Sequence, residues 1–203
     1  MNSIHPLFSY PVMICSEKYR FSEQEELFFT NCSMRDNVGN SMSTDDKVLA
    51  NEELKILDNF INLQLNFYHE KVLRMKAENE LYVTQSWINK SSGSDFHPKH
   101  KHPNSLLSGV MFVNGTTGDG MPPIRFHRSN MLLPLELEFE EYNDFNSGVQ
   151  WFLPEKGMLI IFPSVLEHDV EKNTTTLERV TLSFNTFIKG PLGNPAQLTQ
   201  VVS

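Results

Sequence analysis

Apolar residues recur at helical spacing in one segment of the N-terminal third. The segment contains Leu54, Ile56, Leu57, Phe60, Ile61, Leu63 and Leu65 to Phe67, with Val72 and Leu73 further on. Side chains three and four positions apart share one face of a helix, so this spacing predicts a helix over about 51–77. We expect Asp45 or Asn51 to cap its N-terminus.

After residue 79 the pattern changes to short apolar or alternating runs, which predict β-strands. Turns containing Gly, Pro, Asn or Asp separate them. The predicted strands are 81–89, 106–114, 123–127, 133–141, 149–153, 158–164, 167–171 and 179–189. Their short spacing favours a sandwich or barrel over alternating strands and helices, and about eight strands indicate a mainly β jelly roll.

The two ends of the chain and the segment before the helix lack such regularity. Residues 5–14 hold two prolines among apolar β-formers, which indicates an edge strand or an extended arm. Residues 22–50 are polar and rich in turn formers, and within them 31–46 is the best candidate for a mobile loop. The tail from Pro191 onward is expected to be a loose end.

Length and composition place this pattern in a single globular domain. The 203 residues predict one domain over 1–203, with an N-terminal arm and helix over 1–79 and a β core over 80–190. With 39% apolar and 21% charged residues, the chain is neither a membrane protein nor a disordered one. The formal net charge of −8 disfavours nucleic acid as a partner.

Cysteine usage and the first residues bear on the compartment. There are two cysteines, Cys15 and Cys32, and no secretory pattern opens the chain. We therefore expect free thiols and a cytoplasmic protein.

Three of the seven histidines, His97, His100 and His102, fall within six positions, directly before a predicted strand. On a strand His100 and His102 would point the same way, so both can bind one metal ion. His168, which begins a later strand, is the natural third ligand. The alternative is a solvated loop whose imidazoles titrate near neutral pH.

The remaining candidates near this cluster rank lower. Pro98 and odd spacing separate His97 from His100, so we expect His97 to lie beside the ligands or at the entrance, and Asp95 is a comparable outsider. The other histidines, His5, His69 and His127, are expected to be ordinary core or surface residues.

A second polar pattern lies on the last predicted strand. Arg179, Thr181 and Ser183 share one face among apolar neighbours. An arginine inside a barrel needs an anionic partner, which a ligand carboxylate can supply. The alternative is an internal salt bridge to Glu138 or Glu140, and the pattern leaves both open.

Three stretches resemble the phage-type branch of the Fe(II)- and 2-oxoglutarate-dependent oxygenase superfamily. They are "SWINKSSGSDFHPKHKHPNSLLSGVMFV", "PEKGMLIIFPSVLEHDVEKN" and "ERVTLSFN", and the likeness covers roughly residues 80–188. The resemblance implies a double-stranded β-helix, the cupin-like jelly roll, with an N-terminal helix packed on one side.

The resemblance also implies a site. Fe(II) is held by His100, His102 and His168, and Arg179 binds the far carboxylate of the cosubstrate 2-oxoglutarate. Further cosubstrate contacts are expected from Thr181, Ser108 and Asn89.

One position departs from the pattern of most of the superfamily. There the second ligand is Asp or Glu, whereas this chain has His102. A neutral imidazole in place of a carboxylate raises the net charge of the site by about one unit, which alters redox tuning and anion affinity. A histidine at this position is usual in the branch that the chain resembles.

The predicted function is therefore a non-heme iron dioxygenase. It would couple oxidative decarboxylation of 2-oxoglutarate by O2 to hydroxylation of an unknown small molecule or protein side chain. One alternative is a three-histidine cupin-type dioxygenase that does not use 2-oxoglutarate. Another is a non-catalytic jelly-roll binding protein, for example with structural zinc.

Three further expectations follow from this prediction. Segments 31–46 and 114–123 are expected to act as lids over the site. Exposed strand edges favour a homodimer. If the gene belongs to a phage, the compartment would be the host cytoplasm.

Overall fold

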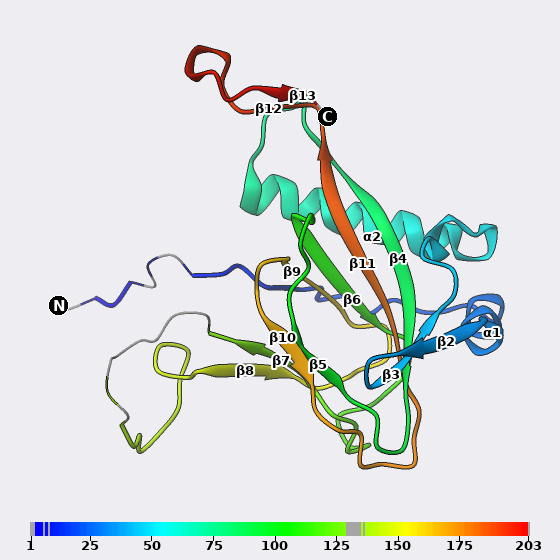
Figure 1. The fold of residues 1–203 in the computed structure, drawn as a ribbon. Coiled ribbons are helices and arrows are strands. Elements are labelled where there is room, and N and C mark those ends of the chain that lie inside the picture. The colour runs from blue at the N-terminus through cyan, green and yellow to red at the C-terminus, as the bar shows by residue number, and fades with distance from the viewer. Residues whose placement is uncertain (1–2, 6, 8, 129–134, 136, 203) are drawn as a thin grey trace.

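The computed structural model describes residues 3–5, 7, 9–128, 135 and 137–202. Within these residues the protein consists of two facing antiparallel sheets with helices packed outside the larger one (Figure 1). This is the predicted double-stranded β-helix, a mainly β jelly roll with an N-terminal helix on one side.

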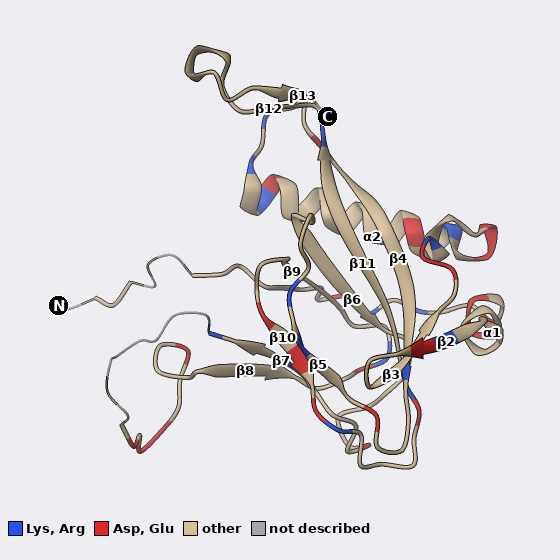
Figure 2. Cartoon of the chain, viewed as in Figure 1, with Lys and Arg blue, Asp and Glu red and all other residues tan. Residues whose placement is uncertain are grey.

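The larger sheet has seven strands among the described residues. In spatial order they are β1 (Met13–Ile14), β9 (Leu159–Pro163), β6 (Leu107–Phe112), β11 (Arg179–Lys189), β4 (Glu80–Ser91), β3 (Asn40–Ser43) and β2 (Met34–Asn37). The central strands β6 and β9 carry no charged residue, as expected for strands that are covered on both faces (Figure 2).

The smaller sheet faces the first one and carries part of the candidate site. Its strands, again in spatial order, are β5 (His97–His100), β10 (His168–Val170), β7 (Ile124–His127) and β8 (Val149–Phe152). A separate hairpin of β12 (Pro191–Leu192) and β13 (Val201–Val202) ends the described chain.

The described helices precede the β core, apart from one short turn near the C-terminus. They are α1 (Glu23–Asn31), α2 (Lys55–Tyr68), the 3₁₀ turns η1 (Val48–Ala50), η2 (Glu52–Leu54) and η4 (Pro195–Gln197), and the π-helical turn η3 (His69–Leu73). Helix α2 is amphipathic, and its buried residues Leu57, Ile61 and Leu65 face the larger sheet.

Alternation along the strands divides the buried apolar residues into two cores. On β11, Leu182 and Phe184 point outward and pack with α2 in the larger core. The smaller core lies between the two sheets and includes Phe112, Phe126 and Phe162. The polar face of β11, which starts with Arg179, therefore points into the space between the sheets.

Most of the predicted elements are confirmed, with shifts at their ends. The predicted helix at 51–77 corresponds to η2, α2 and η3. Asn51 occupies the N-cap position of η2, as predicted, but its side chain makes no capping hydrogen bond, and Leu54 before α2 makes none either. Asp45 and Asn51 instead bond to each other and to nearby backbone. The arm at 5–14 supplies β1, an edge strand as expected.

One predicted strand is absent from the described residues. No strand forms in the described part of 133–141, namely residue 135 and residues 137–141, and the rest of that stretch lies outside the described residues. Alternation of Leu and Glu alone does not create a strand without a partner to pair with.

The segment 22–50 is not a structureless loop. Ser22 and Glu25 form a capping box that starts α1, and 34–43 form a hairpin in which β3 pairs with β4. The predicted lid at 31–46 is thus part of the sheet, and the tail after residue 190 forms the β12–β13 hairpin. A lid role for 114–123 stays a prediction.

Among the described residues, none of the helices has the length and apolar character needed to cross a membrane.

Candidate metal centre

Strand pairing brings two of the three candidate histidines together. β5 and β10 are antiparallel neighbours, and His100 lies directly opposite His168 in their register. Their ring centroids are 4.3 Å apart. Residues opposite each other in such a pair share one face, which here is the face toward the larger sheet.

The third histidine arrives by a different route from the one predicted. β5 ends at His100, so strand alternation does not place His102. Its backbone N–H instead donates to the carbonyl of Ser164 at 3.0 Å, which turns the chain back toward β10. His102 Nε2 then lies 3.3 Å from His168 Nε2.

The three imidazoles together form a group that can hold one ion. One ligand atom from each of His100, His102 and His168 can be chosen so that all three lie within 4.8 Å of one another. Metal–nitrogen bonds to imidazole are about 2.0–2.1 Å long, so two nitrogens on one ion lie about 3–4 Å apart. The observed spacing is close to that geometry.

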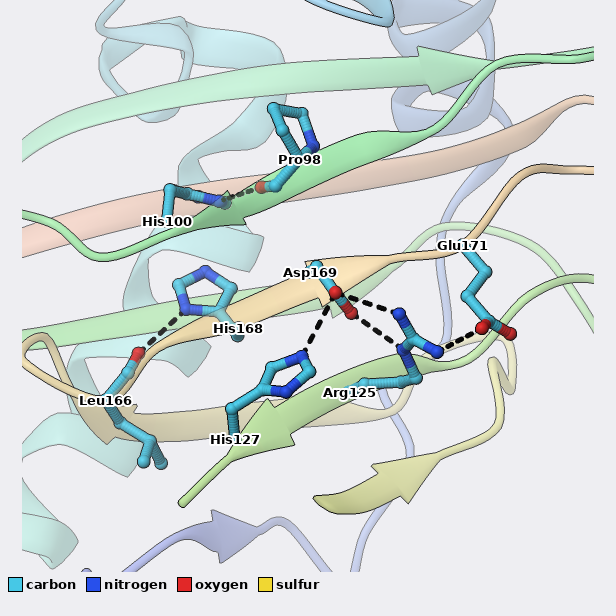
Figure 3. A network of polar contacts seen from close by, with 8 residues as sticks. All are labelled: Pro98, His100, Arg125, His127, Leu166, His168, Asp169 and Glu171. Carbon is cyan, nitrogen blue, oxygen red and sulfur yellow. Dashed lines mark hydrogen bonds and ion pairs between the residues drawn. The ribbon is translucent and has the colours of Figure 1, made fainter. Parts of the chain in front are cut away.

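Backbone carbonyls orient two of the rings. His100 Nδ1 lies 2.8 Å from the carbonyl of Pro98, and His168 Nδ1 lies 3.0 Å from that of Leu166 (Figure 3). A carbonyl can only accept, so Nδ1 carries the proton and Nε2 keeps its lone pair. This tautomer is the one that a metal ligand needs.

Burial keeps these rings neutral. Burial and, to a smaller extent, the neighbouring His100 together lower the pKa of His168 to about 3 and that of His102 to about 4. The pKa of His100 is also lowered, chiefly by burial. Neutral imidazoles with free lone pairs are suited to a cation, so the site fits a divalent metal ion.

The carboxylate next to His168 is held by a cation. Asp169 points to the opposite side of β10, where Arg125 Nε and Nη2 donate to its two oxygens at 2.8 and 2.9 Å (Figure 3). His127 Nε2 lies 3.0 Å from the same group, and Glu171 pairs with Arg125. His127 was expected to be an ordinary residue. Residues 125 and 127 are two positions apart on a strand, so their side chains share a face, and this spacing was the sequence signal for the network.

Arg179 is buried without an anionic partner. It is 4% exposed, and its Nε has no hydrogen-bond partner. Within the described part of the chain the guanidinium makes no ion pair, so the predicted alternative of a salt bridge to Glu138 or Glu140 is wrong. Its Cζ lies 5.2 Å from the ring centre of Phe112. Burial lowers the pKa of Arg179 to about 10.

Arg179 and the three histidines line one cavity between the sheets, together with Thr181 and Asn89. Asn89 Nδ2 lies 3.0 Å from Ser183 Oγ, while Asn89 Oδ1 is buried without a partner. With the amide turned over, Ser183 would donate to Oδ1 and the NH₂ group would face the cavity. Two orphaned polar groups beside one cavity indicate a polar ligand.

Ser108 is engaged elsewhere. Its hydroxyl bonds to Ser164 Oγ at 2.8 Å and to Asn185 Oδ1 at 2.9 Å, and it is not among the cavity-lining residues. Asp95 accepts from the backbone of Ser92 in a turn and is likewise outside the cavity. The contacts of Ser108 give its predicted cosubstrate role no support, and the substitution Ser108→Ala tests that role.

Two further residues with flat rings line the cavity. His97 lies beside the ligands, as expected, and stacks on His100 with ring centroids 4.5 Å apart. Trp87 was not among the predicted site residues, and its ring centroid lies 5.8 Å from that of His102. Trp87 lies two positions from Asn89 on β4, so the two side chains share a face, and this spacing could have identified Trp87 from the sequence.

Fold and site define a double-stranded β-helix protein with a candidate metal centre between its two sheets. The family model described as "Putative 2OG-Fe(II) oxygenase" matches residues 85–185, which include all three histidines and Arg179. The chain belongs to the 2OG-Fe(II) oxygenase family. Its members are Fe(II)- and 2-oxoglutarate-dependent dioxygenases that use O2, so the predicted enzyme class and cofactors are confirmed.

Solved structures share this fold at low sequence identity. A 2OG-Fe(II) oxygenase family oxidoreductase from Burkholderia pseudomallei has a TM-score of 0.59 and 13% identity, covering 86% of this chain and 83% of its own. HygX from Streptomyces hygroscopicus, solved with nickel, 2-oxoglutarate and hygromycin B, has a TM-score of 0.58 and 9% identity, covering 86% and 82%.

A third solved structure is the 2-oxoglutarate-dependent carbocyclase SnoK from nogalamycin biosynthesis. It has a TM-score of 0.56 and 13% identity, covering 87% of this chain and 80% of its own. No curated protein matches the chain.

Proposed function

We propose that this protein hydroxylates a small molecule or a protein side chain, using Fe(II) held by His100, His102 and His168 and 2-oxoglutarate held by Arg179. The observation that carries the proposal is the buried guanidinium of Arg179, which makes no ion pair with any described residue and lines the same cavity as the three imidazoles. A dianionic cosubstrate beside a cation site satisfies both groups at once.

The iron, when bound, supplies the oxidation of 2-oxoglutarate to succinate and CO2 by O2 and the oxidation of the substrate C–H bond. The chain's residues supply the geometry. His100 and His168 are oriented by backbone carbonyls, so their lone pairs need no rearrangement before a metal arrives.

Arg179 fixes one end of the cosubstrate. Its planar guanidinium can donate two parallel hydrogen bonds to a carboxylate, in a cavity where burial strengthens them. Thr181 is buried one step along the same strand face, and the amide of Asn89 is available from β4 across the register. These groups hold the cosubstrate in one orientation relative to the imidazoles.

The third histidine changes the charge of this arrangement. Within the described residues, the carboxylate adjacent to a ligand, Asp169, is held by Arg125, so the candidate ligand set is neutral. A neutral set leaves the full positive charge of the metal for anionic ligands. This favours tight binding of a chelating 2-oxo acid.

A titration tests the proposal directly. Fe(II)-loaded protein is titrated with 2-oxoglutarate under anaerobic conditions, and the visible charge-transfer absorption of the chelated cosubstrate is followed. We expect a saturable band in wild-type protein, no band in Arg179→Met, and stoichiometric succinate once O2 is admitted. Oxygen consumption that is independent of 2-oxoglutarate would support the cupin-type alternative. Absence of both band and oxygen uptake would support a binding protein.

A further inference from the structure

His97 is a fourth histidine beside the candidate ligands, partly buried, and the proposed metal binding leaves it unused. Its ring lies parallel to that of His100, at 15° between planes. It lines the same cavity as Arg179.

The N-terminal hairpin determines which nitrogen of His97 is free. Asn37 Nδ2 donates to Asn40 Oδ1 at 2.9 Å, so the NH₂ group of Asn40 faces His97, and Asn40 Nδ2 lies 3.2 Å from His97 Nδ1. With the amides in these assigned orientations the NH₂ group donates, so Nδ1 accepts and the ring proton is assigned to Nε2.

The hairpin is fastened to the start of β5 by a close backbone contact. The Phe96 N–H donates to the Gly39 carbonyl at 2.8 Å. Gly39 has φ +81°, and a Cβ there would meet the carbonyl oxygen of Phe96 at 2.8 Å. The contact therefore requires glycine, and it places Asn40 against His97.

We propose that His97 is a cosubstrate-binding residue whose Nε2–H, with the tautomer fixed by Asn40, donates to a carboxylate oxygen of 2-oxoglutarate in the cavity. The inference rests on the proposed function. With Nδ1 engaged and one face covered by His100, Nε2 is the nitrogen that remains for a ligand.

Three substitutions at this position separate donation from ring packing. His97→Phe keeps a flat ring against His100 and removes the donor. His97→Gln places an amide NH₂ near the position of Nε2, whereas His97→Asn places it near Nδ1. Lys99→Ala is the matched control, since Lys99 lies two residues further on β5 and is exposed.

The measurements are the Kd of 2-oxoglutarate, from the anaerobic titration, and the Kd of Ni(II), from calorimetry without cosubstrate. We expect His97→Phe and His97→Asn to weaken 2-oxoglutarate binding about tenfold or more, as the loss of one hydrogen bond to a charged group predicts. His97→Gln should recover most of the affinity. Ni(II) affinity should stay within about twofold of wild type in all three variants, and Lys99→Ala should bind both as wild type does.

Each result decides between the two claims. Wild-type protein without a 2-oxoglutarate band would overturn the proposed function and this inference with it. A wild-type band with unchanged affinity in His97→Phe would overturn the inference alone. Equal losses of Ni(II) and 2-oxoglutarate affinity would show that His97 acts only by supporting His100. If His97→Phe does not fold, the comparison of His97→Gln with His97→Asn gives the same decision.

Discussion

Replacing Arg179 by methionine should make the ligand-free protein more stable, against the usual effect of a core substitution. The depression of its pKa from 12.5 to about 10 corresponds to a cost of about 3 kcal/mol for keeping the buried guanidinium charged. The desolvated cation–π contact with Phe112 is lost in the variant, at about 2 kcal/mol. The net expected gain is about 1 kcal/mol, because methionine fills similar space without a charge.

The assay is thermal unfolding of metal-free protein at pH 7.5. For a chain of this size, about 1 kcal/mol raises Tm by about 2–4 °C. Arg125→Met is the opposite control, because Arg125 is paired with Asp169 through two hydrogen bonds. Its loss leaves a partly buried carboxylate with a weaker partner and should lower stability by about 1–3 kcal/mol.

The ligand-bound protein should show the reverse order. With Fe(II) under anaerobic conditions, 2-oxoglutarate at about 100 times its Kd should stabilise wild type by about 2.7 kcal/mol, and Arg179→Met should gain nothing. A lower Tm for Arg179→Met in the ligand-free state would refute the reasoning, since it would mean that the guanidinium is solvated or paired there.

Three further outcomes are expected. Gly109→Ala should destabilise the fold by about 1–3 kcal/mol in urea unfolding, since its Cβ would lie 2.1 Å from the Phe184 ring; unchanged stability would disprove the tight packing of β6 on β11. Asn89→Ala should weaken 2-oxoglutarate binding about tenfold in the anaerobic titration, whereas Ser108→Ala should leave it unchanged; the opposite pattern would restore Ser108 as a contact. Metal-free protein should lose about 2 kcal/mol between pH 7 and 5 from His168 alone, because its pKa of about 3 in the folded state and 6.5 in the unfolded state means that the unfolded chain binds more protons in this range; constant urea midpoints would contradict this.

The strand pattern and the metal-ligand candidates could be predicted because they depend on local periodicity. Alternation on β11 placed Arg179 and Thr181 on one inward face, and the spacing of apolar residues located α2. His168 could be predicted as a partner of the earlier histidines because it begins a strand that can run back beside them. In the structure it lies opposite His100.

What the sequence did not predict depends on contacts between distant segments. The hairpin at 34–43 is polar and rich in turn formers, and its stability comes from pairing with β4, which no local pattern encodes. His102 is placed by a backbone bond to Ser164, some sixty positions away. Asp169 likewise meets Arg125 because β10 and β7 are neighbours in the sheet, which the residues next to Asp169 in the sequence do not indicate.

β5 is the outermost strand of its sheet, and within the described residues its ladder partner is β10 alone. It has four residues, and Pro98 has no N–H to donate to the ladder. A metal ion bound by both His100 and His168 would cross-link the edge strand β5 to β10. Metal binding at this site would then slow amide hydrogen exchange in β5. The supply of iron would therefore set how often β5 separates from β10.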